Sequence, residues 1–265
     1  MSTLAHVEGD EHLTPHAALN RRIWDNQADE YQARHGRQLQ SSGGTAWGVW
    51  QIPESELQVL GEVAGRDVLE LGCGACQWSI ALSRLGARVT ALDNSSRQLE
   101  HARRLMAKAG VDFPLVHASA ENTGLPDASF DVVFCDFGAM TFTDPQLSVP
   151  EAARLLRPGG LFAFSALTPI VDLVWAPQDE HPGECFVTDY WTGIKRTQPP
   201  GEAVNFQLPY GEWIALFGRC GMRVESLIEL RPPPHALSSY RSERDREWAR
   251  RWPMEHVWRL RRELA

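Results

Sequence analysis

Cysteine is scarce in this chain of 265 residues, and its five cysteines lie at scattered positions. An odd number without a regular spacing is a poor disulfide framework, so we expect reduced thiols. The chain also lacks an apolar run long enough to span a bilayer. Residues 1–11 are polar and acidic, without the apolar core or the basic flank of a signal peptide. These absences predict a soluble, cytoplasmic protein with no membrane partner.

Positive charge is in deficit as well, because 26 Lys and Arg residues oppose 34 Asp and Glu residues and give a formal net charge of −8. Partners that carry many phosphates select basic surfaces, so this balance argues against a nucleic-acid partner. No internal repeat or low-complexity tract is visible. The length and composition fit one α/β domain with insertions, and we expect a monomer or a homodimer.

Apolar strands alternate with amphipathic helices from residue 66 onward, which is typical of a parallel sheet. The predicted strands are 66–71, 88–93, 113–118, 130–137, 161–166, 222–230 and 256–262. The predicted helices are 77–85, 97–109, 150–156, 211–220 and 242–251, with a further helix at 18–34 before the sheet. Ser95 offers an N-cap for the helix at 97–109, and Gly110 offers a stop.

Four segments follow from this pattern. Residues 1–60 are predicted to form an N-terminal helical lid, and residues 61–168 are predicted to form the ligand-binding core. Residues 169–209 are rich in proline and lack a clear period, which is too long for a plain connector and predicts a substrate cap. Residues 210–265 are predicted to complete the core sheet.

A glycine turn follows the first strand, in the sequence ELGCG at residues 70–74. Open α/β sheets bind ligands at the carboxyl ends of their strands, and glycine lets the backbone approach a ligand closely. A dinucleotide fingerprint needs a third glycine where Gln77 stands, so the NAD pattern fails. Cys73 and Cys76 form a C-x-x-C pair without a second pair or a nearby histidine, so we expect no metal site.

The turn resembles motif I of class I S-adenosylmethionine-dependent methyltransferases, and residues 118–121, 125–133 and 155–160 resemble later motifs of that superfamily. Motif I usually continues to another glycine, and here Cys76 takes that place. The resemblance implies a Rossmann-like, seven-stranded, mostly parallel sheet with the last strand antiparallel and helices on both faces. It also implies S-adenosylmethionine as the cofactor and S-adenosylhomocysteine as the product.

Candidate cofactor residues cluster at the tips of the first strands. Asp93 ends the second strand about twenty residues after the turn, where a carboxylate can accept both ribose hydroxyls, although it can also cap the next helix. The resemblance places Ser119 and Ala120 beside the adenine, and Tyr31 over the cofactor unless it is an ordinary half-buried helix residue. The complete predicted set is Tyr31, Glu70, Gly72, Cys73, Gly74, Asp93, Asn94, Gln98, Ser119, Ala120 and Asp136.

The candidates for catalysis are Asp136, His181 and Tyr31. Asp136 ends the fourth strand, where relatives bring acceptor and methyl group together, but it can also contact the cofactor or cap the next turn. His181 lies in the predicted cap, and its alternative is a solvated loop side chain. His117, in a core strand, is interpreted as structural.

Tryptophan is abundant, with ten residues, and its faces bury large areas and attract cations. We predict an acceptor site lined by Trp47, Trp50, Phe137, Trp175 and Trp191, although most tryptophans pack in cores. The predicted function is methyl transfer to O, N or C of a small, partly aromatic or apolar metabolite, an intermediate of natural-product biosynthesis. The alternatives are a non-catalytic module that binds S-adenosylmethionine and an enzyme that methylates protein or RNA.

Overall fold

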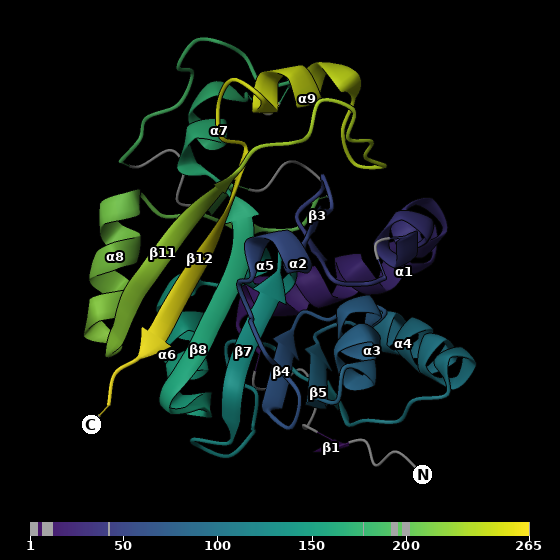
Figure 1. Cartoon of the computed structure of the whole chain (residues 1–265). Helices are drawn as coiled ribbons and strands as arrows, with labels where there is room; N and C mark the ends of the chain where they lie inside the picture. Colours follow the sequence, from purple (N-terminus) through teal and green to yellow (C-terminus); the bar gives the residue numbers. More distant parts are fainter. Residues whose placement is uncertain are drawn as a thin grey trace.

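The computed structural model describes residues 5–6, 13–41, 43–176, 178–191, 196–197 and 202–264. An eight-stranded sheet forms its centre (Figure 1). The strands, in their spatial order, are β1 (Ala5–His6), β6 (Leu115–His117), β5 (Arg88–Asp93), β4 (Asp67–Leu71), β7 (Phe130–Asp136), β8 (Leu156–Leu167), β12 (Glu255–Arg262) and β11 (Met222–Leu230). The predicted seven strands are confirmed, and the two-residue β1 adds an edge that pairs with β6.

All strands of this sheet run parallel except β12, which is antiparallel to both β8 and β11. The prediction of one antiparallel strand, the last in the chain, is therefore confirmed. Residues 157–160, which precede the predicted strand 161–166, form an irregularity inside β8, because the register passes from Phe130↔Leu156 to Val132↔Leu161. Four residues of β8 thus lie opposite a single residue of β7, and Gly159 provides the left-handed backbone (φ +78°) that this bulge requires.

Helices cover both faces of the sheet because each strand alternates two sets of apolar side chains (Figure 1). On one face, Val68 and Val132 pack with residues of α3 (Gln77–Arg84) and α4 (Ser96–Ala109). On the other face, Leu69 and Val133 pack with residues of α6 (Pro145–Leu155) and α8 (Tyr210–Arg219). Helix α4 begins and ends as predicted, since the Ser95 hydroxyl accepts from the Gln98 amide and Gly110 adopts a left-handed conformation.

The helix α1 (Pro15–Ser41) is longer than the predicted segment 18–34 and packs against α4. It is followed by a short hairpin of β2 (Ala46–Trp47) and β3 (Ile52–Pro53), and by α2 (Glu54–Leu57). The helix α5 (Gly138–Phe142) comes directly after β7. None of the helices in the described part of the chain has the length and apolarity that crossing a bilayer requires.

The segment after β8 contains α7 (Pro169–Val174) and a small antiparallel pair, β9 (Arg196–Thr197) and β10 (Asn205–Phe206). Near the end of the chain, α9 (Glu243–Ala249) lies beside α7 at the same end of the molecule (Figure 1). Parts of the predicted lid (1–4, 7–12 and 42) and of the predicted cap (177, 192–195 and 198–201) lie outside the described residues.

Candidate functional site

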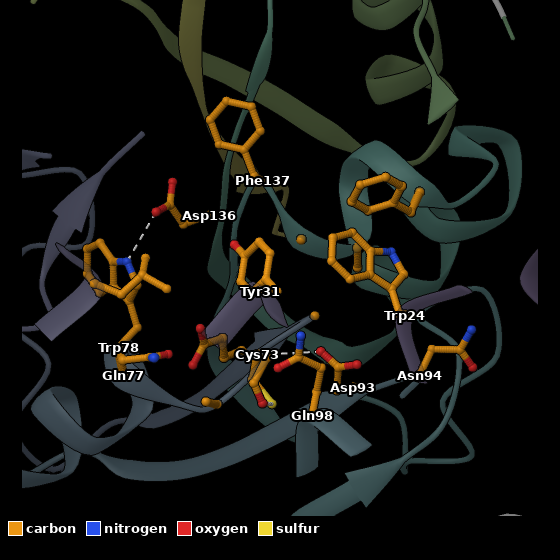
Figure 2. Close-up of a pocket in the computed structure, with 18 of the residues that line it drawn as sticks. Trp24, Tyr31, Cys73, Gln77, Trp78, Asp93, Asn94, Gln98, Asp136 and Phe137 are labelled. Atoms are coloured by element: carbon orange, nitrogen blue, oxygen red, sulfur yellow. Dashed lines mark hydrogen bonds between the residues drawn. The ribbon is translucent and has the colours of Figure 1, made fainter. Parts of the chain in front are cut away.

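A cavity of about 350 Å³ lies at the carboxyl ends of β4, β5 and β7, where a parallel sheet places its ligands. Its lining comes from the strand ends and the turns after them, the helix α1, the loop around the β2–β3 hairpin, residues of α3, α4 and α5, and the loop before α9. Figure 2 shows Tyr31 at its centre, between Trp78 on one side and Trp24 on the other, with Asp93 and Gln98 below. Residues far apart in the chain therefore converge on one site.

The glycine turn adopts the backbone conformations that its residues permit. Gly72 and Gly74 have φ values of +68° and +52°. A Cβ on Gly72 would lie 2.3 Å from the amide nitrogen of Ala139, so only glycine fits between β4 and α5. A Cβ on Gly74 would meet nothing closer than 3.8 Å, and Gly74 faces the cavity. Cys76, where motif I usually has glycine, is also left-handed (φ +63°), so the turn keeps its shape despite the side chain.

Asp93, at the end of β5, holds the glycine turn that follows β4. Its Oδ2 accepts a hydrogen bond from the Gly74 amide at 2.7 Å, and its Oδ1 accepts from the Ser95 amide at 2.8 Å. Each carboxylate oxygen has a second lone pair, so the side chain can accept two further hydrogen bonds while it holds the turn. Burial raises the pKa of Asp93 to about 6, against the lowering effect of the Ser95 and Gly74 amides. Asp93 is therefore ionised at neutral pH and available to hydroxyl donors.

Glu70 lies below the turn, almost fully buried. One oxygen, Oε2, accepts from the amide of Ser79 at 3.0 Å and from its hydroxyl at 2.5 Å, which ties β4 to the first turn of α3. Burial raises the pKa of Glu70 to about 8. The site thus contains a carboxylate that is protonated in part at neutral pH and that a nearby cation would ionise.

Asp136, at the end of β7, is the third carboxylate of the cavity lining. It accepts hydrogen bonds from the Gly48 amide at 3.0 Å, the Ser165 hydroxyl at 2.5 Å and the Trp78 indole at 3.4 Å. Burial raises its pKa, and these three donors oppose the shift. A carboxylate has about four acceptor positions, so roughly one remains for a ligand.

The predicted adenine end is only partly assembled at the cavity. Asn94, Gln98 and Ala120 line it, whereas Ser119 does not. Ser119 is buried, and its hydroxyl accepts from the Glu121 amide at 3.2 Å, so it stabilises its own turn. The side chain of Gln98 accepts from Gln32 of α1 at 2.9 Å, which connects α1 to this end of the cavity.

The structure places four of the five predicted acceptor-site aromatics outside the cavity lining. Trp47 is fully buried against Trp78 and Phe134, and its indole donates to Glu54 at 2.6 Å. Trp50 also lies in the core. Trp175 donates to the Asp179 carbonyl, and Trp191 is 66% exposed. Phe137 alone of this group lines the cavity.

His181 does not line the cavity either. Its Nδ1 lies 2.8 Å from Oδ1 of Asp245, a residue whose other oxygen forms the capping box of α9 with Ser242. His181 therefore connects the segment after α7 to α9, and its placement gives it no contact with a reacting group.

Several cavity residues were not predicted from the sequence. Trp78 is the second residue of α3. Because a helix that starts after a glycine turn often contacts a ligand, its position could have been used to predict it. Gln32, Phe142, Tyr240 and Arg241 had no such signal, because α1, α5 and the proline-rich loop before α9 reach the site only through the tertiary fold.

Tyr31 of α1 and Tyr240 of the loop before α9 meet across the cavity, with their hydroxyl oxygens 2.8 Å apart. Tyr240 also stacks on His35, with ring centroids 3.9 Å apart and an interplanar angle of 5°. Burial raises the pKa of Tyr31 to about 12, so both hydroxyls stay protonated at neutral pH. This contact joins the N-terminal helix to the C-terminal third of the chain.

We predict that Tyr31→Phe and Tyr240→Phe are coupled in stability. Each change removes one hydroxyl and leaves the other without this partner, so the double variant costs less than the sum of the two single variants. The coupling energy is about 0.5–1.5 kcal/mol. Urea unfolding of the four proteins measures it, and additive effects would show that the hydroxyl contact contributes nothing.

Glu255, at the start of β12, is a fully buried carboxylate behind the cavity lining. Its Oε2 accepts from the Val49 amide at 3.0 Å, and its Oε1 has no partner among the described residues. Burial raises its pKa from the ordinary 4.5 to about 8. The folded chain thus keeps a proton that the unfolded chain releases between these pH values.

We expect Glu255 to lower the stability of the protein as the pH rises. Its favourable contribution is complete below pH 4.5 and is lost as the pH rises from there through about 8, because over this range the unfolded state releases a proton that the folded state keeps. From pH 5 to pH 8, the free energy of unfolding should fall by about 2–4 kcal/mol more in the wild type than in Glu255→Gln. Urea titrations at several pH values measure this difference.

Glu225→Gln is the control with the opposite sign. Hydrogen bonds from Arg261 and the charge of Arg259 lower the pKa of Glu225, so its stabilising contribution is present above pH 4.5 and is lost as the pH falls. If Glu255→Gln leaves the pH dependence between 5 and 8 unchanged, the assigned burial of this carboxylate is contradicted.

Comparison with known proteins agrees with this geometry. Residues 69–164 match the family described as a methyltransferase domain. A demethylmenaquinone methyltransferase of Clavibacter sepedonicus is 36% identical over 128 residues, which cover 48% of this chain and 51% of that protein. A ubiquinone biosynthesis O-methyltransferase of Aromatoleum aromaticum is 37% identical over 106 residues, which cover 40% of this chain and 45% of that protein.

The chain spans about half the length of the curated relatives that it matches. Among solved structures, an S-adenosylmethionine-dependent methyltransferase of Mesorhizobium loti superposes with a TM-score of 0.61 at 25% identity, covering 78% of this chain and 96% of that chain. The strand order and the glycine turn are those of the class I fold, and residues 69–164 are similar to a methyltransferase domain. The resemblance inferred from the sequence is confirmed at this level.

Proposed function

We propose that this protein is an S-adenosylmethionine-dependent methyltransferase that acts on a small molecule. The observation that carries the proposal is the glycine turn at residues 72–74, which faces the cavity and is fastened to the carboxylate of Asp93. Open space beside Gly74 and two spare lone pairs on Asp93 fit a ribose at this position. The match of residues 69–164 to a methyltransferase domain supports the same cofactor.

The cofactor-binding residues in this proposal are those of the predicted set that line the cavity: Tyr31, Glu70, Gly72, Cys73, Gly74, Asp93, Asn94, Gln98, Ala120 and Asp136. Bound S-adenosylmethionine supplies an activated methyl group on a sulfonium. We propose that Glu70, which lines the cavity, attracts the ammonium of the methionyl part, and that this attraction offsets the cost of ionising a buried carboxyl group. Ser119 and His181 have no place in this site.

In this proposal the protein contributes to methyl transfer by aligning the acceptor atom with the methyl group and by excluding water. Bound S-adenosylmethionine would supply its methyl group to an acceptor O, N or C atom and would leave as the neutral thioether S-adenosylhomocysteine. A protonated acceptor also has to lose a proton, and Asp136 is the group we propose to receive it. The rings of Tyr31 and Phe137 limit the positions that the acceptor can take (Figure 2).

The proposed acceptor is a partly aromatic or apolar metabolite, because Trp24, Phe137 and Phe142 line the cavity. The curated relatives act in ubiquinone biosynthesis or on demethylmenaquinone, as their names state, which favours a metabolite as the acceptor class here. We propose an intermediate of natural-product biosynthesis, with residues 1–60 as a lid and 169–209 as a cap. A cytoplasmic monomer or homodimer without a nucleic-acid partner fits the net charge of −8.

The test is transfer of a labelled methyl group from S-adenosylmethionine to a panel of small phenols, amines and acids. We expect turnover on at least one class and loss of turnover in Asp136→Asn, and calorimetry of this variant measures how much of the loss comes from weaker binding of S-adenosylhomocysteine. Tight cofactor binding without turnover on any candidate would favour a binding module instead. Labelling of a protein or RNA fraction in place of the panel would favour a macromolecular substrate.

A further inference from the structure

Arg241 is the one cationic side chain among the described residues that line the cavity. It follows Tyr240 in the loop between β11 and α9, and its guanidinium carbon lies 4.7 Å from the centroid of the Trp175 ring. Its Nε is buried and has no hydrogen-bond partner among the described residues. Arg241 thus lies against an aromatic face on one side and lines the cavity, and its buried Nε has no acceptor among the described residues.

A buried donor without an acceptor is costly, on the order of 1–3 kcal/mol, and more when it belongs to a charged group. The carboxylate of Glu255 does not remove this cost, because its own Oε1 also lacks a partner in the described part of the chain. Arginine keeps its charge under such conditions and presents a planar set of donors that matches a carboxylate. An anionic ligand group would satisfy Arg241 best.

Arg241 approaches the cavity from the side of α7 and α9. It lies two residues before α9, and its guanidinium lies over the ring of Trp175, which directly follows α7. The glycine turn and Asp93 lie instead at the carboxyl ends of β4 and β5.

We propose that Arg241 binds a carboxylate of the methyl acceptor, which makes the acceptor an aromatic or apolar acid. This inference rests on the proposed function. The rest of the lining supports it, because Val49, Phe137 and Phe142 provide an apolar surface for the body of such a molecule. The other carboxyl side chains of the described lining, Glu70, Asp93 and Asp136, do not attract an anion in either protonation state, so a carboxylate has one favourable position.

The experiment measures binding of paired probes to protein loaded with S-adenosylhomocysteine. The pairs are 4-hydroxybenzoate with phenol, and 3,4-dihydroxybenzoate with catechol, which differ by one carboxylate. By calorimetry, the acid of at least one pair should bind the wild type about 10- to 100-fold more tightly than its neutral partner. In Arg241→Gln this ratio should fall close to one, and in Arg241→Lys it should take an intermediate value.

Arg251→Gln is the matched control. Arg251 also stacks on a tryptophan, with its guanidinium carbon 3.9 Å from the Trp252 centroid, but it is exposed and pairs with Glu184 outside the cavity. This variant should keep the wild-type ratio. Unchanged affinity for S-adenosylhomocysteine in all three variants shows that they are folded.

Three results would overturn the inference: no preference for the acids in the wild type, a preference that survives in Arg241→Gln, or no binding of any probe to the loaded protein. A fourth concerns the carboxylate of the cofactor itself. If Arg241→Gln weakens S-adenosylhomocysteine but leaves 5′-methylthioadenosine unchanged, Arg241 binds the cofactor and not the acceptor. Failure of the wild type to bind S-adenosylhomocysteine would instead contradict the proposed function.

Discussion

Replacement of Asp93 by alanine should weaken binding of S-adenosylhomocysteine by about 30- to 1,000-fold. Asp93 is placed to accept both ribose hydroxyls, and loss of two charge-assisted hydrogen bonds costs about 2–4 kcal/mol. The turn also loses the acceptor of the Gly74 amide, which adds to the effect. Calorimetry of the purified variant measures the affinity, and Asp93→Asn, which keeps one acceptor oxygen, should lie between the two proteins.

Asp25→Asn is a suitable control for this experiment. Asp25 lies close by and accepts from the Ser95 hydroxyl at 2.7 Å and the Arg97 amide at 3.1 Å, but it does not line the cavity. Its replacement should leave the affinity within a few-fold of the wild type. The wild-type affinity should also decline as the pH falls through about 6, where Asp93 takes up a proton. Unchanged binding in Asp93→Ala would remove the ribose assignment.

Gly72→Ala should destabilise the protein by about 3–5 kcal/mol and abolish cofactor binding. Two costs combine: alanine at φ +68° is strained by about 1 kcal/mol, and its Cβ would lie 2.3 Å from the backbone nitrogen of Ala139. Because the obstacle is backbone, it can recede only if α5 moves away from β4. Thermal and urea unfolding measure the loss of stability.

Gly65→Ala separates these two costs. Gly65 has almost the same backbone conformation, φ +70°, but nothing lies within 4 Å of the position its Cβ would take. This variant should therefore lose only about 1 kcal/mol and should bind S-adenosylhomocysteine as the wild type does. Equal destabilisation in the two variants would show that the contact between β4 and α5 is not restrictive.

The residues predicted for the cofactor side lie at one cavity because their positions are set by local structure. The strand, the turn at Gly72 and Gly74, and Asp93 at the next strand end are positioned by strand pairing between β4 and β5. Their residue types also favour ligand binding, since two glycines and a carboxylate at neighbouring strand ends are more typical of a binding site than of a hydrophobic core. The structure accordingly brings all three to one cavity.

The acceptor side could not be predicted in the same way. Trp47 was assigned to the cavity by its residue type alone. In the structure its indole donates a hydrogen bond to Glu54, and its ring packs in the core. Tyr240 and Arg241 belong to a loop without periodicity, and contacts with α1 some 209 residues earlier place them. Neither composition nor spacing contains such long-range information.

The amides of Gly48 and Val49 have a consequence for how the protein is made. These consecutive residues donate to Asp136 and Glu255, and the second partner lies 206 residues later in the chain. A ribosome adds about 5–20 residues per second, so β12 is synthesised on the order of ten seconds or more after the β2–β3 hairpin. A nascent chain that ends before Glu255 therefore leaves the amide of Val49, a residue of the cavity lining, without its acceptor.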